Sequence, residues 1–501
     1  MNPISHYLNR LYQALIPSGT VAERAVKSGI WATLINIVDR VLQLGKLVVL
    51  ANLLAPADFG LMGIALLTLA VFQQFSNLGL DAALIQNEDA DVDRYLDTAW
   101  AMKLGRSILI AVLAFIVAPY AASFFGEARA TNIIRVIAFS PLLMSLKNPG
   151  VMYLQKDLEF HKQFLFTISS TVVSVIVAIG SAIQYQTVWA LVVGLLAGNI
   201  TSVLVSYLVN EYRPSLSFEI ELAKELYGYG KWLTLSGILV FLIVQGDDAF
   251  VGWFLGATAL GFYQMAYRLS NAPATEIAHV ISSVAFPTYS KVQNNVETLR
   301  TAYFRTIRVT TLVSFPTAVG IIVVSPMFVN VILGSDWRPI IPVMQALAVF
   351  AAFRSIAASN GSLFNAIGRP DIASKMQIFN VLKLSFFIYP FTYTWGLEGV
   401  AYLLVFHAVT SNPILDYIAI QLVNGSVWRY IKILWIPLIG SVTMGSILSI
   451  ILSIELTTPS VISLIIIIGA GAMLYIGIVS VLDHYTGMNI KLEIKQIRDT
   501  V

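Results

Sequence analysis

Long apolar runs recur from one end of the sequence to the other, and they constrain its fold more than any other feature. A helix needs about 20 apolar residues to cross roughly 30 Å of hydrocarbon. Runs of that length are found at 28–53, 59–85, 96–124, 130–152, 163–184, 187–210, 228–255, 259–288, 302–326, 339–366, 372–394, 397–423, 430–453 and 459–482. We therefore predict an all-α, polytopic membrane protein of about fourteen transmembrane helices.

The composition agrees with a lipid environment. Of the 501 residues, 57% are hydrophobic and 12% are charged, and the mean hydropathy is +0.77, whereas a soluble domain is roughly a quarter charged. The sequence contains no cysteine, which excludes disulfides, thiolate catalysis and thiolate metal sites. Its five histidines are scattered and show no metal-ligand spacing. We therefore expect no metal site.

Lysine and arginine in the short loops predict the orientation, because cytoplasmic loops of membrane proteins carry an excess of both. With the N-terminus in the cytoplasm, the loops on that side hold nearly all of these residues, and the opposite loops hold only Arg129 and Arg338. The same asymmetry favours an even number of spans. We therefore predict that both termini are cytoplasmic. No loop is long enough to fold as a separate soluble domain.

An internal repeat indicates how the helices are grouped. Residues 29–60 align without gaps with residues 230–261. The identical pairs include a tryptophan and glycines, which apolar composition explains poorly: Gly29/Gly230, Trp31/Trp232, Thr33/Thr234, Leu34/Leu235, Ile37/Ile238, Gly45/Gly246, Leu54/Leu255 and Gly60/Gly261. Six predicted spans separate the two starts, so both halves enter the membrane in the same sense.

The repeat predicts two six-helix lobes, related by a parallel pseudo-twofold axis, plus two C-terminal helices. The predicted segments are a cytoplasmic N-terminal segment (1–27), an N-lobe (28–210), a cytoplasmic linker (211–227), a C-lobe (228–423), the last two spans (424–484) and a cytoplasmic tail (485–501). Transporters with such lobes bind cargo between them and rock to alternate access. A static scaffold that retains an old repeat is the alternative.

Basic side chains interrupt the spans at depths where lipid is expected. Each ionisable group there costs at least about 2.5–3.5 kcal/mol to insert, so it must face a cavity or another charge. We predict a polar, cationic cavity between the lobes that binds an anionic head group, lined by Arg40, Lys46, Lys103, Arg106, Arg268, Arg354, Gln43, Gln74 and Asn77. Arginine binds phosphate through a planar fork and lysine as a point charge. Structural ion pairs, such as Asp39 with Lys103, are the alternative.

Three acidic residues also lie within predicted spans. Asp39, Gln43 and Lys46 are spaced by four and three, so they share one helix face. Asp247 and Asp248 are adjacent, and two adjacent carboxylates resist joint ionisation, so this pair can hold one proton. In the repeat alignment Lys46 corresponds to Asp247, so equivalent positions carry opposite charge. We expect Asp39, Asp247 and Asp248 to bind a coupling H⁺ or Na⁺, and we expect no other cofactor.

Several motifs resemble those of bacterial polysaccharide exporters. They lie at Leu53–Leu61, Gln74–Leu80, Ala82–Gln86, Asn210–Pro214 and Phe364–Pro370. On these residues the chain resembles the flippases for O-antigen, colanic-acid or teichuronic-acid type repeat units, within the multidrug/oligosaccharidyl-lipid/polysaccharide exporter superfamily. The resemblance covers nearly the whole chain.

This resemblance implies two lobes around a central cavity. It implies a cargo of undecaprenyl pyrophosphate bearing an oligosaccharide, flipped from the cytoplasmic to the periplasmic leaflet of the inner membrane for surface polysaccharide or exopolysaccharide biosynthesis. It also implies cation-coupled antiport by alternating access. Membrane lipid, a polysaccharide polymerase and glycosyltransferases are the expected partners, and nucleic acid is not.

Two other functions share some of these features. A drug/cation antiporter of the same superfamily would have the same lobes, but basic residues at membrane depth favour anionic cargo. A membrane glycosyltransferase or polymerase would act on the same lipid but needs a larger outward loop. The sequence also contains no nucleotide-binding glycine loop and no nucleophile elbow. We therefore predict a transporter and not an enzyme.

Overall fold

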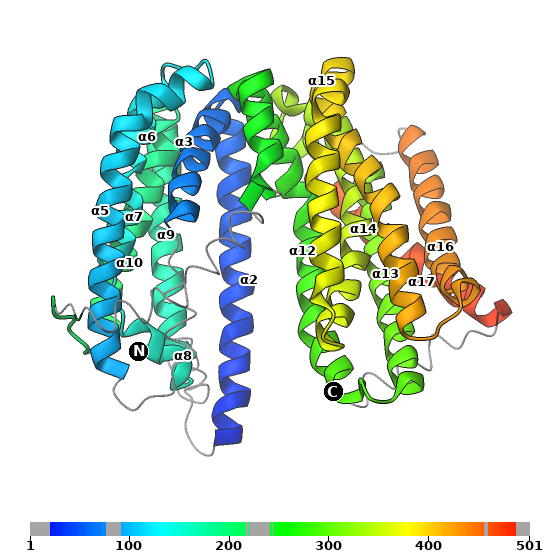
Figure 1. The fold of residues 1–501 in the computed structure, drawn as a ribbon. Coiled ribbons are helices and arrows are strands. Elements are labelled where there is room, and N and C mark those ends of the chain that lie inside the picture. Colours follow the sequence, from blue (N-terminus) through cyan, green and yellow to red (C-terminus); the bar gives the residue numbers. More distant parts are fainter. Residues whose placement is uncertain are drawn as a thin grey trace, which may run out of the picture. The chain divides into compact units, whose positions relative to one another are not determined.

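The protein is described here by a computed structural model, which covers residues 21–76, 92–216, 219, 241–242, 244–454 and 459–486. Every regular element in these residues is a helix, and no strand occurs among them (Figure 1). Nine of the described helices are long and apolar enough to cross a membrane. The chain packs as two units, Met1–Gly261 and Phe262–Val501.

Parts of several predictions lie outside the described residues. They are the N-terminal segment up to residue 20, the end of the span 59–85 with Asn77, the motif at Ala82–Gln86 and most of that at Gln74–Leu80, most of the linker at 211–227, the beginning of the span 228–255 with the second repeat copy at 230–240, and the tail from residue 487.

The first unit contains the helices of the predicted spans up to residue 255. They are α2 (Val21–Leu53), α3 (Pro56–Phe75), α5 (Val92–Phe124), α6 (Ala130–Ile137), α7 (Phe139–Ser145), α8 (Val151–Lys156), α9 (Phe160–Tyr185), α10 (Trp189–Val209) and a helical stretch at 244–255. The predicted span at 130–152 is broken into α6, α7 and α8. Pro141 and Pro149 each lack a backbone N–H and cannot continue the helical bonding.

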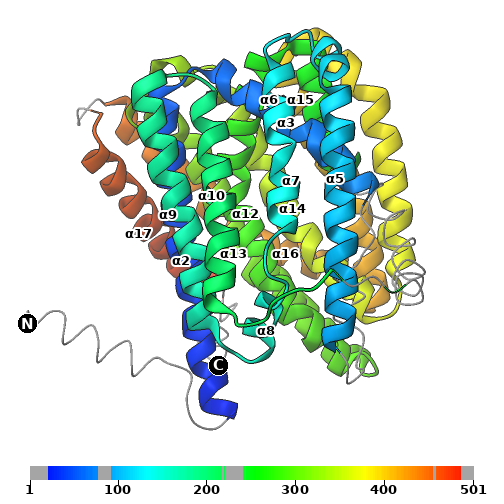
Figure 2. The same cartoon turned by 90° about the vertical axis from the view of Figure 1, so that its left-hand side faces the viewer.

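Close packing of small residues joins the central helices of the first unit. α9 and α10 run side by side (Figure 2), and α2 packs along α9. A Cβ atom added to Gly194 of α10 would lie 2.5 Å from the Cβ of Ala178 on α9. Leu50 of α2 and Leu54, which directly follows α2, form a buried cluster with Ala178 and Ala182 of α9. The spacing of α9 and α10 at Gly194 is therefore set by a glycine against an alanine, whereas leucines fill the contact between α2 and α9.

The start of α3 and the start of α12 (Ala257–Val292) touch through their backbones. A Cβ atom on Gly60 would lie 1.7 Å from the carbonyl oxygen of Ala257, and one on Gly261 would lie 2.1 Å from the carbonyl oxygen of Pro56. Gly60 and Gly261 are an identical pair of the repeat, and Pro56 aligns with Ala257. The contact is therefore reciprocal, with each glycine against the other copy's backbone, and this explains why both positions are glycine.

The second unit contains the rest of α12 and the helices that follow it. They are α13 (Val296–Phe328), a π-helical turn (Val329–Leu333), a 3₁₀ turn (Ser335–Trp337), α14 (Ile340–Ala366), α15 (Pro370–Leu422), α16 (Val427–Ser453) and α17 (Val461–Thr486). α15 is two helices that meet at Gly396, where φ is 58° and ψ is −134°. Glycine adopts a positive φ at little cost, so the break separates the predicted spans 372–394 and 397–423.

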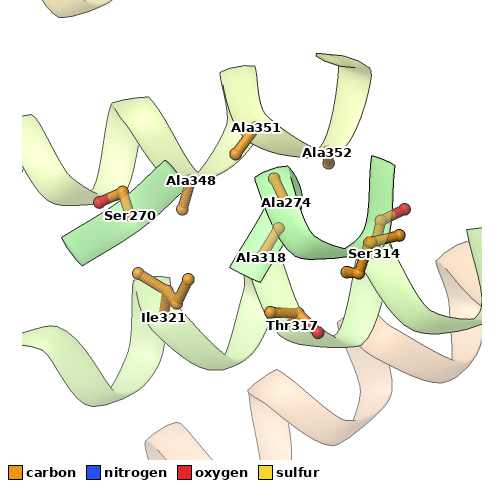
Figure 3. A pocket seen from close by; sticks show the side chains of 10 residues that line it. Ser270, Ala274, Ser314, Thr317, Ala318, Ile321, Ala348, Ala351 and Ala352 are labelled. Carbon is orange, nitrogen blue, oxygen red and sulfur yellow. The ribbon is translucent and has the colours of Figure 1, made fainter. Parts of the chain in front are cut away.

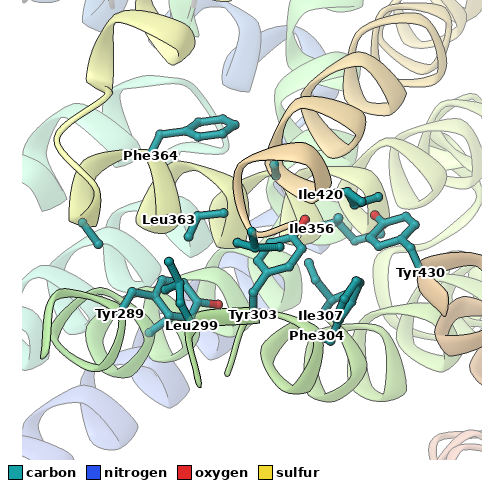
Figure 4. Close-up of a cluster of buried hydrophobic side chains, with 14 of the residues drawn as sticks. Tyr289, Leu299, Tyr303, Phe304, Ile307, Ile356, Leu363, Phe364, Ile420 and Tyr430 are labelled. Atoms are coloured by element: carbon teal, nitrogen blue, oxygen red, sulfur yellow. The ribbon is translucent and has the colours of Figure 1, made fainter. Parts of the chain in front are cut away.

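The core of the second unit is rich in aromatic side chains (Figure 4). α13 packs against α14 and α16, and α14 packs against α15. One buried cluster of this unit contains the aromatic residues Tyr289, Tyr303, Phe304, Phe364 and Tyr430. Burying a large side chain of this kind stabilises a fold by about 1.5–3 kcal/mol. The cluster therefore fixes the arrangement of α12 to α16 around the polar groups described below.

Candidate functional site

Two of the predicted charged residues on α2 face α9. The Thr171 hydroxyl of α9 donates to Asp39 Oδ1 at 2.6 Å, and Lys46 Nζ donates to the Ser174 hydroxyl at 2.8 Å. Both charged side chains are half-buried, while Thr171 is buried. These two charges thus hold α2 to α9 through neutral hydroxyl groups.

Arg40 and Gln43 of α2 are both exposed in the first unit, so Gln43 does not share the half-buried setting of Asp39 and Lys46. Apolar neighbours are exposed as well, since Ile37 is 56% and Val41 is 64% exposed. Arg40 lies near the middle of the apolar run 28–53. The helix therefore carries a guanidinium group at membrane depth, on a surface that its own unit does not cover.

Arg106 on α5 binds the end of α3. Its Nη2 donates to the carbonyl oxygen of Gln73 at 2.6 Å, and its Nε donates to the Ser76 hydroxyl at 2.9 Å. The last carbonyl groups of a helix have no intrahelical partner and attract cations. Arg106 therefore caps α3 in this structure. Lys103 and Gln74 lie close by in the sequence of the same two helices, and both are half-buried.

In the second unit, one of the predicted basic residues of α14 contacts α12, which carries another. Arg354 of α14 donates from Nη1 to the hydroxyl of Tyr267 on α12 at 3.1 Å, and Arg268 follows Tyr267 directly. Both arginines are exposed in this unit. One bond to Tyr267 uses one of the five N–H donors that a guanidinium carries. Each of these two helices of the second unit therefore carries an exposed arginine within an apolar span.

The predicted acidic pair lies in the helical stretch at 244–255. Asp247 and Asp248 are both half-buried, and the backbone N–H of Asp248 donates to Asp247 Oδ1 at 3.0 Å. Asn77 lies outside the described residues. No group of three or more His, Asp or Glu side chains that could hold a metal ion occurs in the described part of the chain.

The motif at Leu53–Leu61 has a structural role that sequence reasoning did not find. Asp58 accepts the backbone N–H of Ala55 at 3.2 Å and that of Val188 at 3.1 Å. The first bond caps the N-terminus of α3, and the second ties it to the loop before α10. With Pro56 in the first turn and Gly60 against α12, the motif positions α3.

The motif at Asn210–Pro214 also fastens a loop. Asn210 Nδ2 donates to the carbonyl oxygen of Gly150 at 2.7 Å, and the Tyr212 hydroxyl donates to Asp97 Oδ1 at 2.6 Å. Asn148 Nδ2 donates to the carbonyl oxygen of Tyr212 at 2.7 Å. The chain leaving α10 is therefore bound to the turn before α8 and to α5. Asp97, which sequence reasoning did not select, accepts the hydrogen bond that ties this segment to α5.

The motif at Phe364–Pro370 ends in a local ion pair. Arg369 Nε donates to Asp371 Oδ1 at 2.9 Å, across the start of α15. This hydrogen bond and the negative charge of Asp371 raise the pKa of the Arg369 guanidinium. The pair therefore stays charged, and it orders the turn between α14 and α15.

A small cavity lies among α12, α13 and α14 in the second unit (Figure 3). Ser270, Ala274, Ser314, Ala318 and Ala348 are among its lining residues. It offers about 10 Å³ for the centre of a water molecule, which is room for about one water. The Ser314 hydroxyl, which is buried, has no protein partner there. The cavity fits a water and is far too small for a sugar or a pyrophosphate.

Comparison with known proteins places this chain among polysaccharide biosynthesis proteins. A family model described as polysaccharide biosynthesis protein matches residues 49–342. The lipopolysaccharide biosynthesis protein WzxC of Escherichia coli is 27% identical over 427 residues, which cover 83% of this chain and 85% of WzxC. The succinoglycan biosynthesis transport protein ExoT of Rhizobium meliloti is 24% identical over 304 residues, 60% of this chain and 61% of ExoT.

Among solved structures, the lipid II flippase MurJ in an inward closed conformation has a TM-score of 0.73 with this chain. It is 15% identical, and the match covers 91% of this chain and 99% of MurJ. The all-α, polytopic fold predicted from the sequence is thereby confirmed. The relatives also confirm the predicted resemblance to bacterial polysaccharide exporters, which are transporters and not enzymes.

Proposed function

Because this chain belongs to the family of polysaccharide biosynthesis proteins, we propose that it flips a lipid-linked oligosaccharide, carried on undecaprenyl pyrophosphate, across the bacterial inner membrane. The cargo would enter from the cytoplasmic leaflet and leave in the periplasmic leaflet. Both termini are then cytoplasmic, as the loop charges predict. A polysaccharide polymerase and glycosyltransferases would act before and after this step.

One observation supports an anionic cargo most directly. Arg40 in the first unit, and Arg268 and Arg354 in the second, carry exposed guanidinium groups within apolar spans. A charged group at that depth is stable only against water, protein or an anionic ligand, because hydrocarbon excludes it. Arginine binds a phosphate with two parallel N–H bonds. These residues therefore suit the pyrophosphate of a lipid-linked sugar better than a cationic drug.

The other residues that we propose for cargo binding are Lys46, Lys103, Arg106, Gln43, Gln74 and Asn77. Arg106 caps α3 and Lys46 binds α9 in this structure, so a role in cargo binding requires these bonds to exchange. Cation coupling through Asp39, Asp247 and Asp248, with H⁺ or Na⁺, is proposed together with these cargo-binding residues.

A flipping assay tests the proposal directly. The purified protein is reconstituted into liposomes with an undecaprenyl-pyrophosphate-linked oligosaccharide that carries a fluorescent sugar. Quenching by a membrane-impermeant reductant then reports which leaflet the sugar occupies. We expect the wild-type protein to expose the sugar on both sides, and Arg40→Gln/Arg268→Gln/Arg354→Gln to slow this at least about tenfold, since each lost charged hydrogen bond is worth about 1.5–3 kcal/mol.

The matched control is Arg129→Gln. Arg129 is an exposed arginine that pairs with Glu127 outside the spans, and its loss should leave the rate unchanged. A wild-type protein that moves cationic dyes and leaves the lipid-linked sugar in place would refute the proposal in favour of a drug antiporter.

A further inference from the structure

The second unit encloses a polar network at the end of its aromatic core. Asn360 of α14 lies at its centre: Asn360 Nδ2 donates to Asp416 Oδ1 on α15 at 2.6 Å, and Asn360 Oδ1 accepts the Tyr303 hydroxyl of α13 at 2.8 Å. Tyr430 of α16 belongs to the same buried cluster as Tyr303, and its hydroxyl group has no hydrogen-bond partner among the described residues. Asp416 is 9% exposed, and Asn360 and Tyr303 are fully buried. Figure 4 shows Tyr303 and Tyr430 pointing toward one another within this core.

The charge of Asp416 has no basic counterpart. No lysine or arginine forms an ion pair with it among the residues that the structure describes. The titratable groups that face it are Tyr303 of α13 and Tyr430 of α16, with Tyr289 of α12 next to Tyr303. Phenol side chains are neutral at physiological pH. The carboxyl group therefore lies among neutral partners only.

Nearby arginines do not change this account. Arg429 precedes Tyr430, but its guanidinium lies over the ring of Phe304 at 5.0 Å from the ring centre. Arg305 and Arg308 are on α13, at roughly 200° and 140° around the helix from Tyr303. These charges belong to other faces of the helices that surround Asp416.

Hydrogen-bond accounting distinguishes the two protonation states of Asp416. An ionised carboxylate has about four acceptor positions, and among the described residues the side-chain hydrogen bond that reaches Asp416 comes from Asn360 Nδ2. Burial of a carboxylate without a cationic partner costs several kcal/mol, and such groups neutralise instead. A neutral carboxylic acid needs fewer donors and fits this environment.

The same geometry distinguishes a proton from a metal cation. A bound Na⁺ or divalent ion needs several oxygen acceptors that converge on one point. Asn360 presents its N–H to Asp416, and its oxygen is already used by Tyr303. Asn360 therefore presents a donor and not an acceptor to Asp416, which disfavours a metal cation, whereas a single proton on the other carboxyl oxygen is compatible with this arrangement.

We propose that Asp416, which accepts a hydrogen bond from Asn360 inside the aromatic core, is a proton-binding site that is protonated in this conformation and that exchanges its proton during transport. This inference rests on the proposed flippase function for its role in the cycle, although proton binding itself does not. Loss of the proton leaves a carboxylate that must gain water, so α14, α15 and α16 have to separate at this end. Asp416 is distinct from Asp39, Asp247 and Asp248.

Infrared spectroscopy of the reconstituted full-length protein tests protonation without any transport measurement. We expect a carbonyl stretching band of a protonated carboxylic acid at neutral pH. This band should shift when aspartate carboxyl carbon is ¹³C-labelled and should disappear in Asp416→Asn. Asp336→Asn, which alters an exposed carboxyl group in the 3₁₀ turn, should leave the band unchanged. Labelling identifies an aspartate in the wild-type protein even when Asp416→Asn folds poorly.

The flipping assay tests the role of the proton. We expect the wild-type rate to change about fivefold with an imposed pH gradient, within the usual range of coupling between two sites. Asp416→Asn should still flip cargo downhill but lose this response. A wild-type protein without the infrared band, or a band that Na⁺ abolishes at constant pH, would overturn the proton site.

An Asp416→Asn protein with an undiminished gradient response would show that the proton is only structural and would also overturn the proposal. Absence of flipping by the wild-type protein, with the infrared band intact, would instead reject the flippase function alone.

Discussion

The interior of each unit is stabilised in a different way. The first unit relies on close helix packing and the second on an enclosed polar network. In the first unit, helices meet through backbone and small residues, as at Gly60 and Gly261, and charges on α2 bind hydroxyl groups at a half-buried face. In the second unit, large aromatic side chains enclose a hydrogen-bonded network with an acidic group inside it. Water can replace a lost bond at the first site, but not at the second.

The largest effect should come from the reciprocal glycine contact of the first unit. Gly60→Ala and Gly261→Ala each place a Cβ atom against a backbone carbonyl, which cannot rotate away. We expect each to lower the free energy of unfolding by about 3 kcal/mol, at the upper end for overpacked sites. Reversible unfolding in mixed micelles measures this.

Gly45→Ala and Gly246→Ala are the matched controls, since they form another identical repeat pair and nothing lies within 4 Å of the added atom. Equal losses in both pairs would show that the close contact at the start of α3 does not hold the unit together.

The next effect should come from the enclosed network of the second unit. Asn360→Leu removes the partner of both Tyr303 and Asp416, and each buried group left unsatisfied costs about 1–3 kcal/mol. We therefore expect a loss of about 2–3 kcal/mol in the same unfolding measurement. Ser355→Ala on the same helix is the control, because its hydroxyl binds only the Ala351 carbonyl of α14. A loss no greater than that of the control would contradict the idea of a closed network.

A smaller effect is expected at Lys383, which links the two halves of α15. Lys383 Nζ donates to the Thr410 hydroxyl at 2.7 Å and also to the Ser411 hydroxyl. Lys383→Met keeps most of the side-chain volume but loses these bonds, so we expect a cost of about 1–2 kcal/mol. Lys375→Met is the control, because Lys375 forms an exposed ion pair with Asp371 and such pairs contribute roughly 0–1 kcal/mol.

The smallest effect is expected at the half-buried charges of the first unit. Thr171→Val removes the donor to Asp39, but water can reach a half-buried carboxylate and take its place. We expect a loss below about 1 kcal/mol, compared with Ser169→Ala, whose hydroxyl is exposed and binds its own helix. A loss as large as that of Asn360→Leu would remove the distinction between the two units.

The motifs at Leu53–Leu61 and Asn210–Pro214 show that the sequence resemblance reflects the fold and not the residues proposed to bind cargo. Both gave the correct family, yet the hydrogen bonds of Asp58 and Asn210 go to backbone groups and not to the cargo residues that the structure describes. Such motifs are informative because only a few residue types satisfy these backbone groups. They identify the fold, and the residues that would bind cargo have to be found by charge and exposure.

The sequence alone determined the membrane class, the helical fold and the repeat, because spanning length and apolar periodicity are local properties of a chain. It also located the break in α15, which separates two apolar runs at Gly396. Tertiary structure alone decided which polar groups meet. Arg106 became a cap for α3, and Asp416 and Asn360, which no sequence pattern singled out, became partners across two helices. Spacing along a chain predicts neighbours on one helix, whereas contacts between helices depend on how their faces pack.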